Sequence, residues 1–314
     1  MGGEIGFGIA IPQGSDAGSD PATLRRFLAR AEDLPYSSAW VLEQPIGVAP
    51  TLDPLSLLAF AAAVTDRLRL CTAVILTPLR TPVGLAKALA TVDRLSGGRL
   101  IAGLGLGGQP ELYPAFGLAP EGRVRRFEEA VRLLMLLWSE PSVTFQGEFW
   151  QLEGVSVAPT PVQRPRPPVW FGGSAPPALR RAARMADGWI GAGSSRTADL
   201  AGSVRTLREE LEAQGRDAAS FALAKRVYVA VDADVTRARD SLSTWFQHFY
   251  GDSELAAQVA VAGPVDACIA GLAQVAEAGV RLIVVNPVDD HERQAQILAE
   301  EVLPHLSGWP DGGT

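Results

Sequence analysis

The chain has 314 residues, of which 47% are hydrophobic and 20% charged, and its formal net charge at pH 7 is −7. A chain of this size buries a large core and suits one α/β barrel or two smaller domains. Because the charge balance is acidic and no run rich in Lys and Arg occurs, neither nucleic acid nor a membrane surface is expected as a partner. Cys71 and Cys268 lie in apolar segments, which indicates reduced thiols and a cytoplasmic protein.

Strand and helix patterns alternate along almost the whole chain. Strands are predicted at 5–11, 38–42, 68–76, 100–104, 169–171, 188–190, 223–231 and 282–285. Helices are predicted at 22–33, 54–64, 83–95, 123–137, 177–185, 198–213, 235–249, 265–278 and 292–306. This alternation indicates an α/β protein, and eight strands favour a (β/α)8 TIM barrel over an open, doubly wound sheet.

The segment 67–108 shows one βαβ unit most clearly. An apolar run predicts a strand buried on both faces, and Thr81 then caps a helix that begins at Pro82. The next buried strand, 100–104, ends in a glycine-rich stretch where bare backbone can approach a ligand. The glycines of this stretch are Gly103, Gly105, Gly107 and Gly108.

Two segments interrupt the alternation, near 142–167 and 247–262. The first has the pattern of a β-hairpin with a proline-rich return. No internal linker divides the chain, so residues 1–314 are predicted to form one domain, with both insertions on the C-terminal face of the barrel. Insertions there commonly act as substrate lids, although an insertion can instead form a dimer interface.

In a barrel, the site lies at the carboxyl ends of the strands. Gly172, Gly173 and Ser174 follow the fifth strand and precede a helix that begins near Pro177, so backbone N–H groups and a helix N-terminus could bind an anion there. An ordinary turn explains the same pattern. The glycine-rich end of the fourth strand offers a second loop, and the two loops could clamp one phosphate-bearing ligand.

No motif for a metal ion or an activated nucleophile is visible. His248, His291 and His305 lie in helix patterns, and the sequence holds no HxH, HExxH, CxxC, GxSxG or P-loop motif. No metal site is therefore predicted. A barrel with few acids and bases of its own points to a cofactor that brings the chemistry.

Five stretches resemble the luciferase-like flavin and deazaflavin oxidoreductases, in order and over nearly the whole chain. They are AEDLPYSSAWVLEQP, TAVILTPLRTPVGLAKALATVDRLSGGRLIAGLGLG, EGRVRRFEEAVRLLMLLW, FQGEFWQLEGVSVAPTPVQRPRPPVWFGGSAPPALRRAARMADGWI and VAGPVDACIAGLAQVAEAGVRLIVV. The resemblance implies a (β/α)8 barrel that binds FMN or coenzyme F-420 at its C-terminal face. It also implies two-electron chemistry on a small organic substrate, with a flavin or F-420 reductase as a possible partner, and a homodimer is expected.

The resemblance also assigns the cofactor-binding residues. It implies a strand-three bulge with a non-proline cis peptide, which backs the cofactor ring and is formed by Thr72, Ala73 and Val74. The cofactor phosphate would lie on Gly172, Gly173 and Ser174. The ring or tail of the cofactor would be lined by Gly105, Gly107 and Gly108.

One departure from the family concerns the proton donor. Family members commonly carry an acid followed by His at the end of strand two, where this chain has Glu43 and Gln44. A glutamine exchanges no protons at neutral pH, but it can orient a carbonyl or a flavin edge. Either Glu43, Glu111 or Tyr113 supplies the proton, or the chemistry needs none. Both glutamates could also be structural.

Three functions stay open from the sequence. The first is coenzyme F-420-dependent hydride transfer to or from a small organic substrate. The second is an FMN-dependent two-component monooxygenase that uses reduced FMN and O2 in a dry pocket, which Trp40, Trp150 and Trp170 could help to line. The third is a non-catalytic ligand-binding barrel, suggested by Gln44.

Overall fold

A closed barrel of parallel strands forms the centre of the computed structural model, which describes residues 5–14, 20–47 and 49–306. The barrel strands are β1 (Gly6–Ala10), β2 (Ser38–Val41), β3 (Arg69–Thr72), β5 (Leu100–Gly105), β8 (Val169–Gly172), β9 (Gly188–Gly191), β10 (Ala222–Val231) and β12 (Leu282–Pro287). They neighbour one another in this order, and β12 pairs with β1 to close the ring. The fold is the predicted (β/α)8 barrel.

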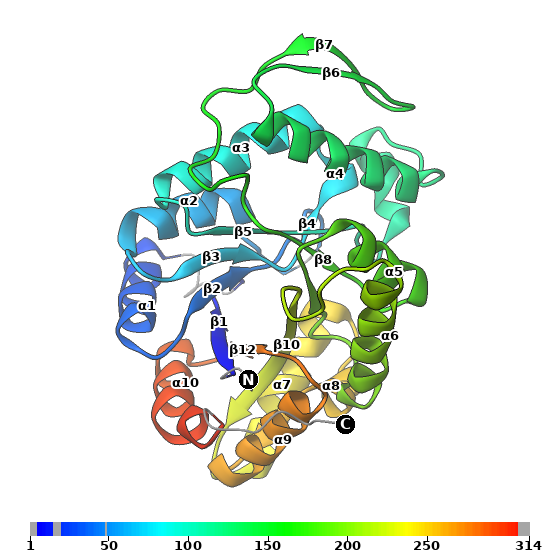
Figure 1. The fold of residues 1–314 in the computed structure, drawn as a ribbon. Helices are drawn as coiled ribbons and strands as arrows, with labels where there is room; N and C mark the ends of the chain where they lie inside the picture. Colours follow the sequence, from blue (N-terminus) through cyan, green and yellow to red (C-terminus); the bar gives the residue numbers. More distant parts are fainter. Residues whose placement is uncertain (1–4, 15–19, 48, 307–314) are drawn as a thin grey trace.

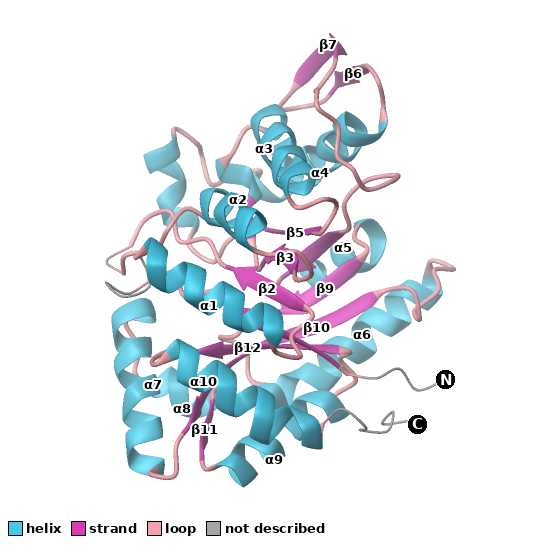
Figure 2. Cartoon of the chain, turned by 90° about the vertical axis from the view of Figure 1, so that its left-hand side faces the viewer, coloured by secondary structure: helices cyan, strands magenta, loops and turns pink. Residues whose placement is uncertain are grey.

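Helices surround the strands on the outside of the barrel (Figures 1 and 2). They are α1 (Pro21–Asp33), α2 (Pro54–Val64), α3 (Pro82–Leu95), α4 (Arg123–Ser139), α5 (Pro176–Met185), α6 (Leu200–Ala213), α7 (Val235–Tyr250), α8 (Glu254–Val259), α9 (Val265–Glu277) and α10 (His291–Ile297). A short strand, β11 (Val261–Gly263), adds to β10 between α8 and α9. No helix in the described ranges is long and apolar enough to cross a membrane.

Local signals in the sequence fix where several helices begin. The carboxylates of Asp20 and Asp53 accept hydrogen bonds from the N–H groups of Thr23 and Ser56, which caps α1 and α2. A proline follows each of these aspartates at the first helical position. The last predicted helix is α-helical only to Ile297, and a π-helical turn and a 3-10 turn follow it.

The third strand differs from the continuous strand predicted at 68–76. It breaks at Ala73 and Val74, and the chain resumes as β4 (Ile75–Leu76), which pairs with β5. Just before the break, the hydroxyl of Thr72 donates to the carbonyl of Gly103 at 2.7 Å and accepts from its N–H at 2.8 Å. A Cβ at position 103 would lie 1.7 Å from the carbonyl oxygen of Thr72, so only glycine permits this approach.

Side chains fill the inside of the barrel. One buried cluster consists of Trp40, Cys71, Ile101, Trp170, Ile190, Ala224 and Val284. The rings of Trp40 and Trp170 lie 5.5 Å apart, centroid to centroid. Because this layer is packed, a ligand has room only at the ends of the strands.

The predicted hairpin forms, but it lies away from the mouth of the barrel. β6 (Val143–Gln146) and β7 (Gln151–Val155) stand on the outer side of α4 (Figure 1). The carboxylate of Glu129 in α4 accepts the backbone N–H groups of residues 148, 149 and 150 at 2.9, 3.0 and 2.9 Å. The hairpin follows α4 in the chain and covers this helix, so it is not placed as a lid on the C-terminal face. The second insertion does reach the mouth, through Phe249 and Tyr250.

Replacing Gly103 with Ala tests the close approach of β3 and β5. We expect Gly103→Ala to lower the free energy of unfolding by about 3 kcal/mol, because the added methyl group collides with backbone. Gly202→Ala is the matched control: no atom lies within 4 Å of the added Cβ, and helix α6 should gain about 0.5–1 kcal/mol. Urea unfolding of both variants measures the difference. Wild-type stability in Gly103→Ala would contradict the approach described.

Candidate functional site

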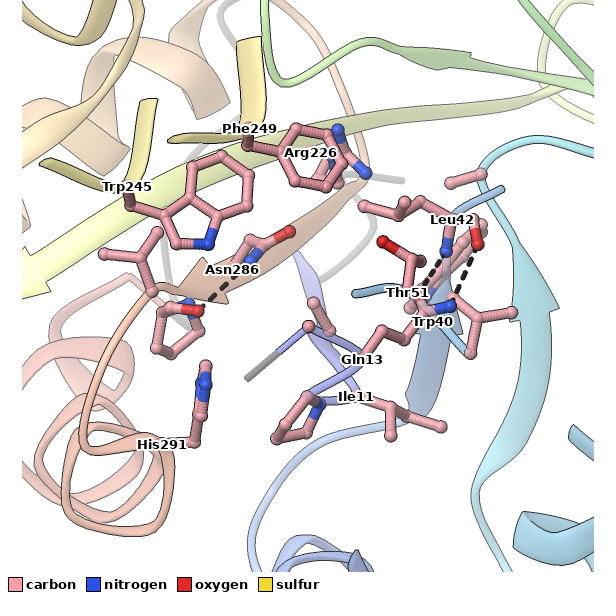
Figure 3. A pocket seen from close by; sticks show the side chains of 17 residues that line it. Ile11, Gln13, Trp40, Leu42, Thr51, Arg226, Trp245, Phe249, Asn286 and His291 are labelled. Atoms are coloured by element: carbon pink, nitrogen blue, oxygen red, sulfur yellow. Dashed lines mark hydrogen bonds between the residues drawn. The ribbon is translucent and has the colours of Figure 1, made fainter. Parts of the chain in front are cut away.

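Two adjoining cavities open at the carboxyl ends of the barrel strands. The larger has a volume of about 370 Å³ and the smaller, shown in Figure 3, about 40 Å³. Both are lined by Leu42, Ala73, Arg226 and Phe249, so they share a wall. This is the face on which (β/α)8 barrels carry their sites, and the larger cavity has the size of a ligand pocket.

The break in the third strand forms part of the wall of the larger cavity. Ala73 and Val74 both line it, and the peptide bond between them is cis, as the family resemblance implies. The side chain of Val74 lies between Gly105 and Gly172, where an added Cβ would come within 2.4 and 3.0 Å of a Val74 methyl group. These two glycines are therefore required for packing against Val74. Thr72 lies behind the wall, bonded to β5.

The glycine-rich end of β5 contributes bare backbone to the larger cavity. Gly107 and Gly108 line it, whereas Gly105 does not. Gly107 has a φ of 78°, in the left-handed region that favours glycine. Around Gly108, no atom lies within 4 Å of the place a Cβ would take. A ligand can therefore approach the backbone closely here.

The predicted anion loop lies at the end of β8, outside the walls of both cavities. Gly173 has a φ of 103°, and its carbonyl accepts the indole N–H of Trp189 at 2.7 Å, which fixes the loop. Gly173 and Ser174 are exposed. The backbone N–H groups of Ser174 and Ala175 donate to no described residue. They are free to bind an anion just before α5.

Lys225 of β10 holds the neighbouring loop, which follows β9. Its ammonium donates to the carbonyl and the hydroxyl of Ser195 at 2.7 and 2.9 Å, and to the carbonyl of Ala192. The side chain is fully buried, and this burial, together with the charge of Arg226, lowers the pKa of Lys225 to about 7. Ser194 of the same loop lines the larger cavity, so Lys225 positions part of its wall from behind.

Glu43 lines the larger cavity, but other groups already occupy its carboxylate. The guanidinium of Arg80 donates to it through Nε at 3.0 Å and through Nη2, and the N–H of Leu76 also donates to it. Its side chain is 4% exposed. This arrangement ties the end of β2 to the start of β4. It suits a positioning role better than the transfer of a proton.

Gln44 has a free donor on the cavity wall. Its Oε1 accepts from the hydroxyl of Thr51 at 3.2 Å, while its Nε2 donates to no described residue. Glu111, in contrast, is exposed and lines neither cavity, so the structure does not bring this predicted acid to the site. Tyr113 does line the larger cavity, where its hydroxyl donates to the carbonyl of Leu106 at 3.0 Å and burial raises its pKa.

Sequence reasoning missed the polar residues at the centre of the site. Arg226 and Asn286 point into the smaller cavity between Trp245 and Phe249 on one side and Gln13 on the other (Figure 3). A charged residue inside the apolar strand β10 is the signal that could have found Arg226. His291, which the sequence places in a helix pattern, also lines the smaller cavity, and burial lowers its pKa. The described ranges hold no group of three or more His, Cys, Asp or Glu residues that could bind a metal ion.

Sequence comparison finds relatives with two kinds of cofactor. The profile of the luciferase-like monooxygenase family matches residues 5–258. The chain is 35% identical over 237 residues to an F420-dependent glucose-6-phosphate dehydrogenase from Kineococcus radiotolerans, which covers 72% of this chain and 68% of that protein. It is 31% identical over 156 residues to an FMNH2-dependent dimethylsulfone monooxygenase from Pseudomonas putida. This alignment covers 49% of this chain and 42% of that protein.

Solved structures share the fold over almost their whole length. An F420-dependent secondary alcohol dehydrogenase in complex with an F420-acetone adduct superposes with a TM-score of 0.85 at 19% identity, over 97% of this chain and 99% of that one. A monooxygenase from Streptomyces bottropensis superposes with a TM-score of 0.81 at 24% identity, over 96% of this chain and 99% of that one. At such identities the likeness supports the barrel and not a particular reaction.

Lys225 should make the stability of the protein depend on pH. The pKa of its ammonium is about 7 in the folded chain and 10.5 ordinarily. Between these values the unfolded chain binds more protons, so the free energy of unfolding rises with pH, by up to about 1.4 kcal/mol per pH unit. Lys225→Met should remove this rise, whereas Lys87→Met, at an exposed lysine, should keep it. Urea unfolding at pH 6, 7, 8 and 9 measures the slopes, and an unchanged slope in Lys225→Met would refute the assignment.

Proposed function

The chain belongs to the luciferase-like monooxygenase family, and from this premise we propose that it is a coenzyme F-420-dependent oxidoreductase that transfers a hydride to or from a small organic substrate. One observation carries the proposal: among the described residues, the walls of the larger cavity offer no free carboxylate and no imidazole, since His291 lines only the smaller cavity. Glu43 is held by Arg80, and Glu111 lies elsewhere. Direct hydride transfer places the smallest demand on protein acids and bases.

The residues present fit such a cofactor. The larger cavity has room for a ring system, with Ala73 and Val74 on one wall and the open backbone of Gly107 and Gly108 on another. The free N–H groups that follow Gly173 suit the phosphate. These residues would hold the cofactor, which when bound supplies two-electron hydride chemistry.

Other residues of the chain would orient the substrate and exclude water. The free Nε2 of Gln44 can donate a hydrogen bond to a carbonyl or to the edge of the cofactor. Trp245 and Phe249 stack with their centroids 4.5 Å apart and close one side of the smaller cavity. Such an apolar wall strengthens the polar contacts made beside it, because it keeps solvent away.

A second candidate is an FMN-dependent two-component monooxygenase that uses reduced FMN and O2. The aromatic wall of the smaller cavity favours it, because oxygen activation on a reduced flavin needs a dry pocket. Of the tryptophans predicted for such a pocket, Trp40 lines it, while Trp150 and Trp170 do not. The partners would be an organic substrate and a reductase. A homodimer and a cytoplasmic location stay predictions.

The proposal is tested by titrating the purified protein with F-420 and with FMN while binding is monitored by fluorescence. We expect F-420 to bind and Gly173→Asp to weaken that binding at least tenfold, because a carboxylate would meet the phosphate. Gly215→Asp is the matched control, since Gly215 also has a positive φ, of 65°, and no atom lies within 4 Å of the place its Cβ would take. Binding of FMN alone would favour the second candidate, and equal affinity in both variants would exclude the loop as the phosphate site.

The pH dependence of kcat/KM separates orientation from proton transfer. If Gln44 only orients, Gln44→Ala should slow turnover severalfold, and Gln44→His should add a pH dependence near the imidazole pKa of about 6.5. Glu111→Gln should leave the profile unchanged, and Glu43→Gln should lower stability without removing a limb of the profile. A limb lost in either glutamate variant would identify that residue as the proton donor.

A further inference from the structure

Arg226 brings a positive charge to the wall that the two cavities share, and its guanidinium lies over the ring of Tyr228 at 5.0 Å but pairs with no carboxylate of the described residues (Figure 3). The residue is 7% exposed. Its Nη2 donates to the hydroxyls of Tyr228 and Tyr250 at 2.8 and 3.4 Å. Its Nε is buried without an acceptor, and its Nη1 makes no hydrogen bond with any described residue. The guanidinium therefore keeps donors that the described chain does not use.

No carboxylate of the described residues offsets this charge. Among the described residues that line the two cavities, Glu43 is the one with a carboxylate, and Arg80 holds it. The adjacent Lys225 cannot offset it either, because this side chain is positive when protonated and neutral otherwise. Burial raises the pKa of Tyr228, so its hydroxyl stays neutral. A buried charge without a partner is costly, and an anionic ligand would remove that cost.

Asn286 supplies a second unused group in the same small cavity. Its Nδ2 donates to the carbonyl of Pro287 at 3.1 Å, while its Oδ1 is buried and receives no hydrogen bond. Within the described ranges, three buried side-chain polar atoms lack a partner, and the remaining one is Nε of Arg126, on α4. Two of the three thus belong to residues that line the 40 Å³ cavity. A ligand that satisfies both needs an anionic acceptor and, beside it, a hydrogen-bond donor.

We propose that Arg226 and Asn286 form a subsite for a hydroxy acid, in which Arg226 binds the acid group and Asn286 accepts a hydrogen bond from the neighbouring hydroxyl. This names a substrate class and rests on the proposed function, which places the substrate at the strand ends. A cavity of 40 Å³ holds on the order of three water-sized groups, which suits a carboxylate. Guanidinium groups also pair well with planar carboxylates. The rest of the substrate extends into the larger cavity, toward Ala73 and Gln44.

Three matched ligands test the two contacts separately on the protein without cofactor. Mandelate carries the acid and the hydroxyl, mandelamide lacks the charge, and phenylacetate lacks the hydroxyl. We expect wild type to bind mandelate at least tenfold more tightly than mandelamide and severalfold more tightly than phenylacetate, by calorimetry. Arg226→Met should abolish the first preference and Asn286→Leu the second. Arg239→Met, at an exposed arginine of α7, is the charge-matched control and should keep both.

Each contrary result has a definite meaning. An undiminished preference for mandelate over mandelamide in Arg226→Met, or the same loss in Arg239→Met, would overturn the subsite. Tighter binding of phenylmethanesulfonate than of phenylacetate would overturn the carboxylate assignment. Because Arg226→Met removes a buried charge without a counter-ion, its thermal midpoint should equal or exceed that of wild type, which separates lost binding from lost folding. Arg226→Lys, which keeps the charge, should retain part of the preference.

Titration of the same variants with F-420 and FMN separates this subsite from the cofactor site. We expect Arg226→Met to bind its cofactor within threefold of wild type. A loss of cofactor affinity as large as the loss of mandelate affinity would assign Arg226 to the cofactor and overturn the subsite. If wild type binds neither cofactor but still prefers mandelate through Arg226, the proposed function fails and the subsite stands.

Discussion

The side chain of Val74, seated between Gly105 and Gly172, is the constraint on which the site depends. It packs at the point where the third strand breaks, and Ala73 at this break lines both cavities. The contact of Thr72 with Gly103 holds the strand on the other side of the break. Glycines on two neighbouring strands thus set the shape of the wall against which a cofactor ring would pack. This shape comes from close packing and involves no polar side chain on the wall itself.

The polar groups divide into those that hold the protein together and those left for a ligand. Glu43 and Tyr113 line the larger cavity but are bonded to their own chain. Gln44 on the larger cavity, Asn286 on the smaller one and Arg226 on the wall between them keep unused hydrogen-bonding atoms. A site with this division binds and orients its ligands while the reacting electrons come from a cofactor, which agrees with an oxidoreductase family that includes F420- and FMNH2-dependent members.

The barrel could be predicted because each βα unit carries its own signals, such as Asp20 before the proline that starts α1. The break in the third strand was visible only through family resemblance, since the run 68–76 contains no Gly, Pro, Asn or Asp to mark it and the glycines that pack against Val74 lie on β5 and β8. Glu111 was misplaced because a short 3-10 helix turns it outward. Arg226 was missed because the direction of its side chain depends on how β10 pairs with β9 and β12.

Lys225 and Arg226 are neighbours in β10, and their opposite directions constrain the number of residues that can precede them in this strand. Successive side chains of a strand face opposite sides, so Arg226 enters the cavity while Lys225 reaches the loop after β9. Inserting or deleting one residue ahead of them would exchange the two directions. The lysine would then enter the cavity, and the loop would lose the ammonium that holds it. The hairpin on α4 carries no such constraint, because it lies outside the ring of barrel strands.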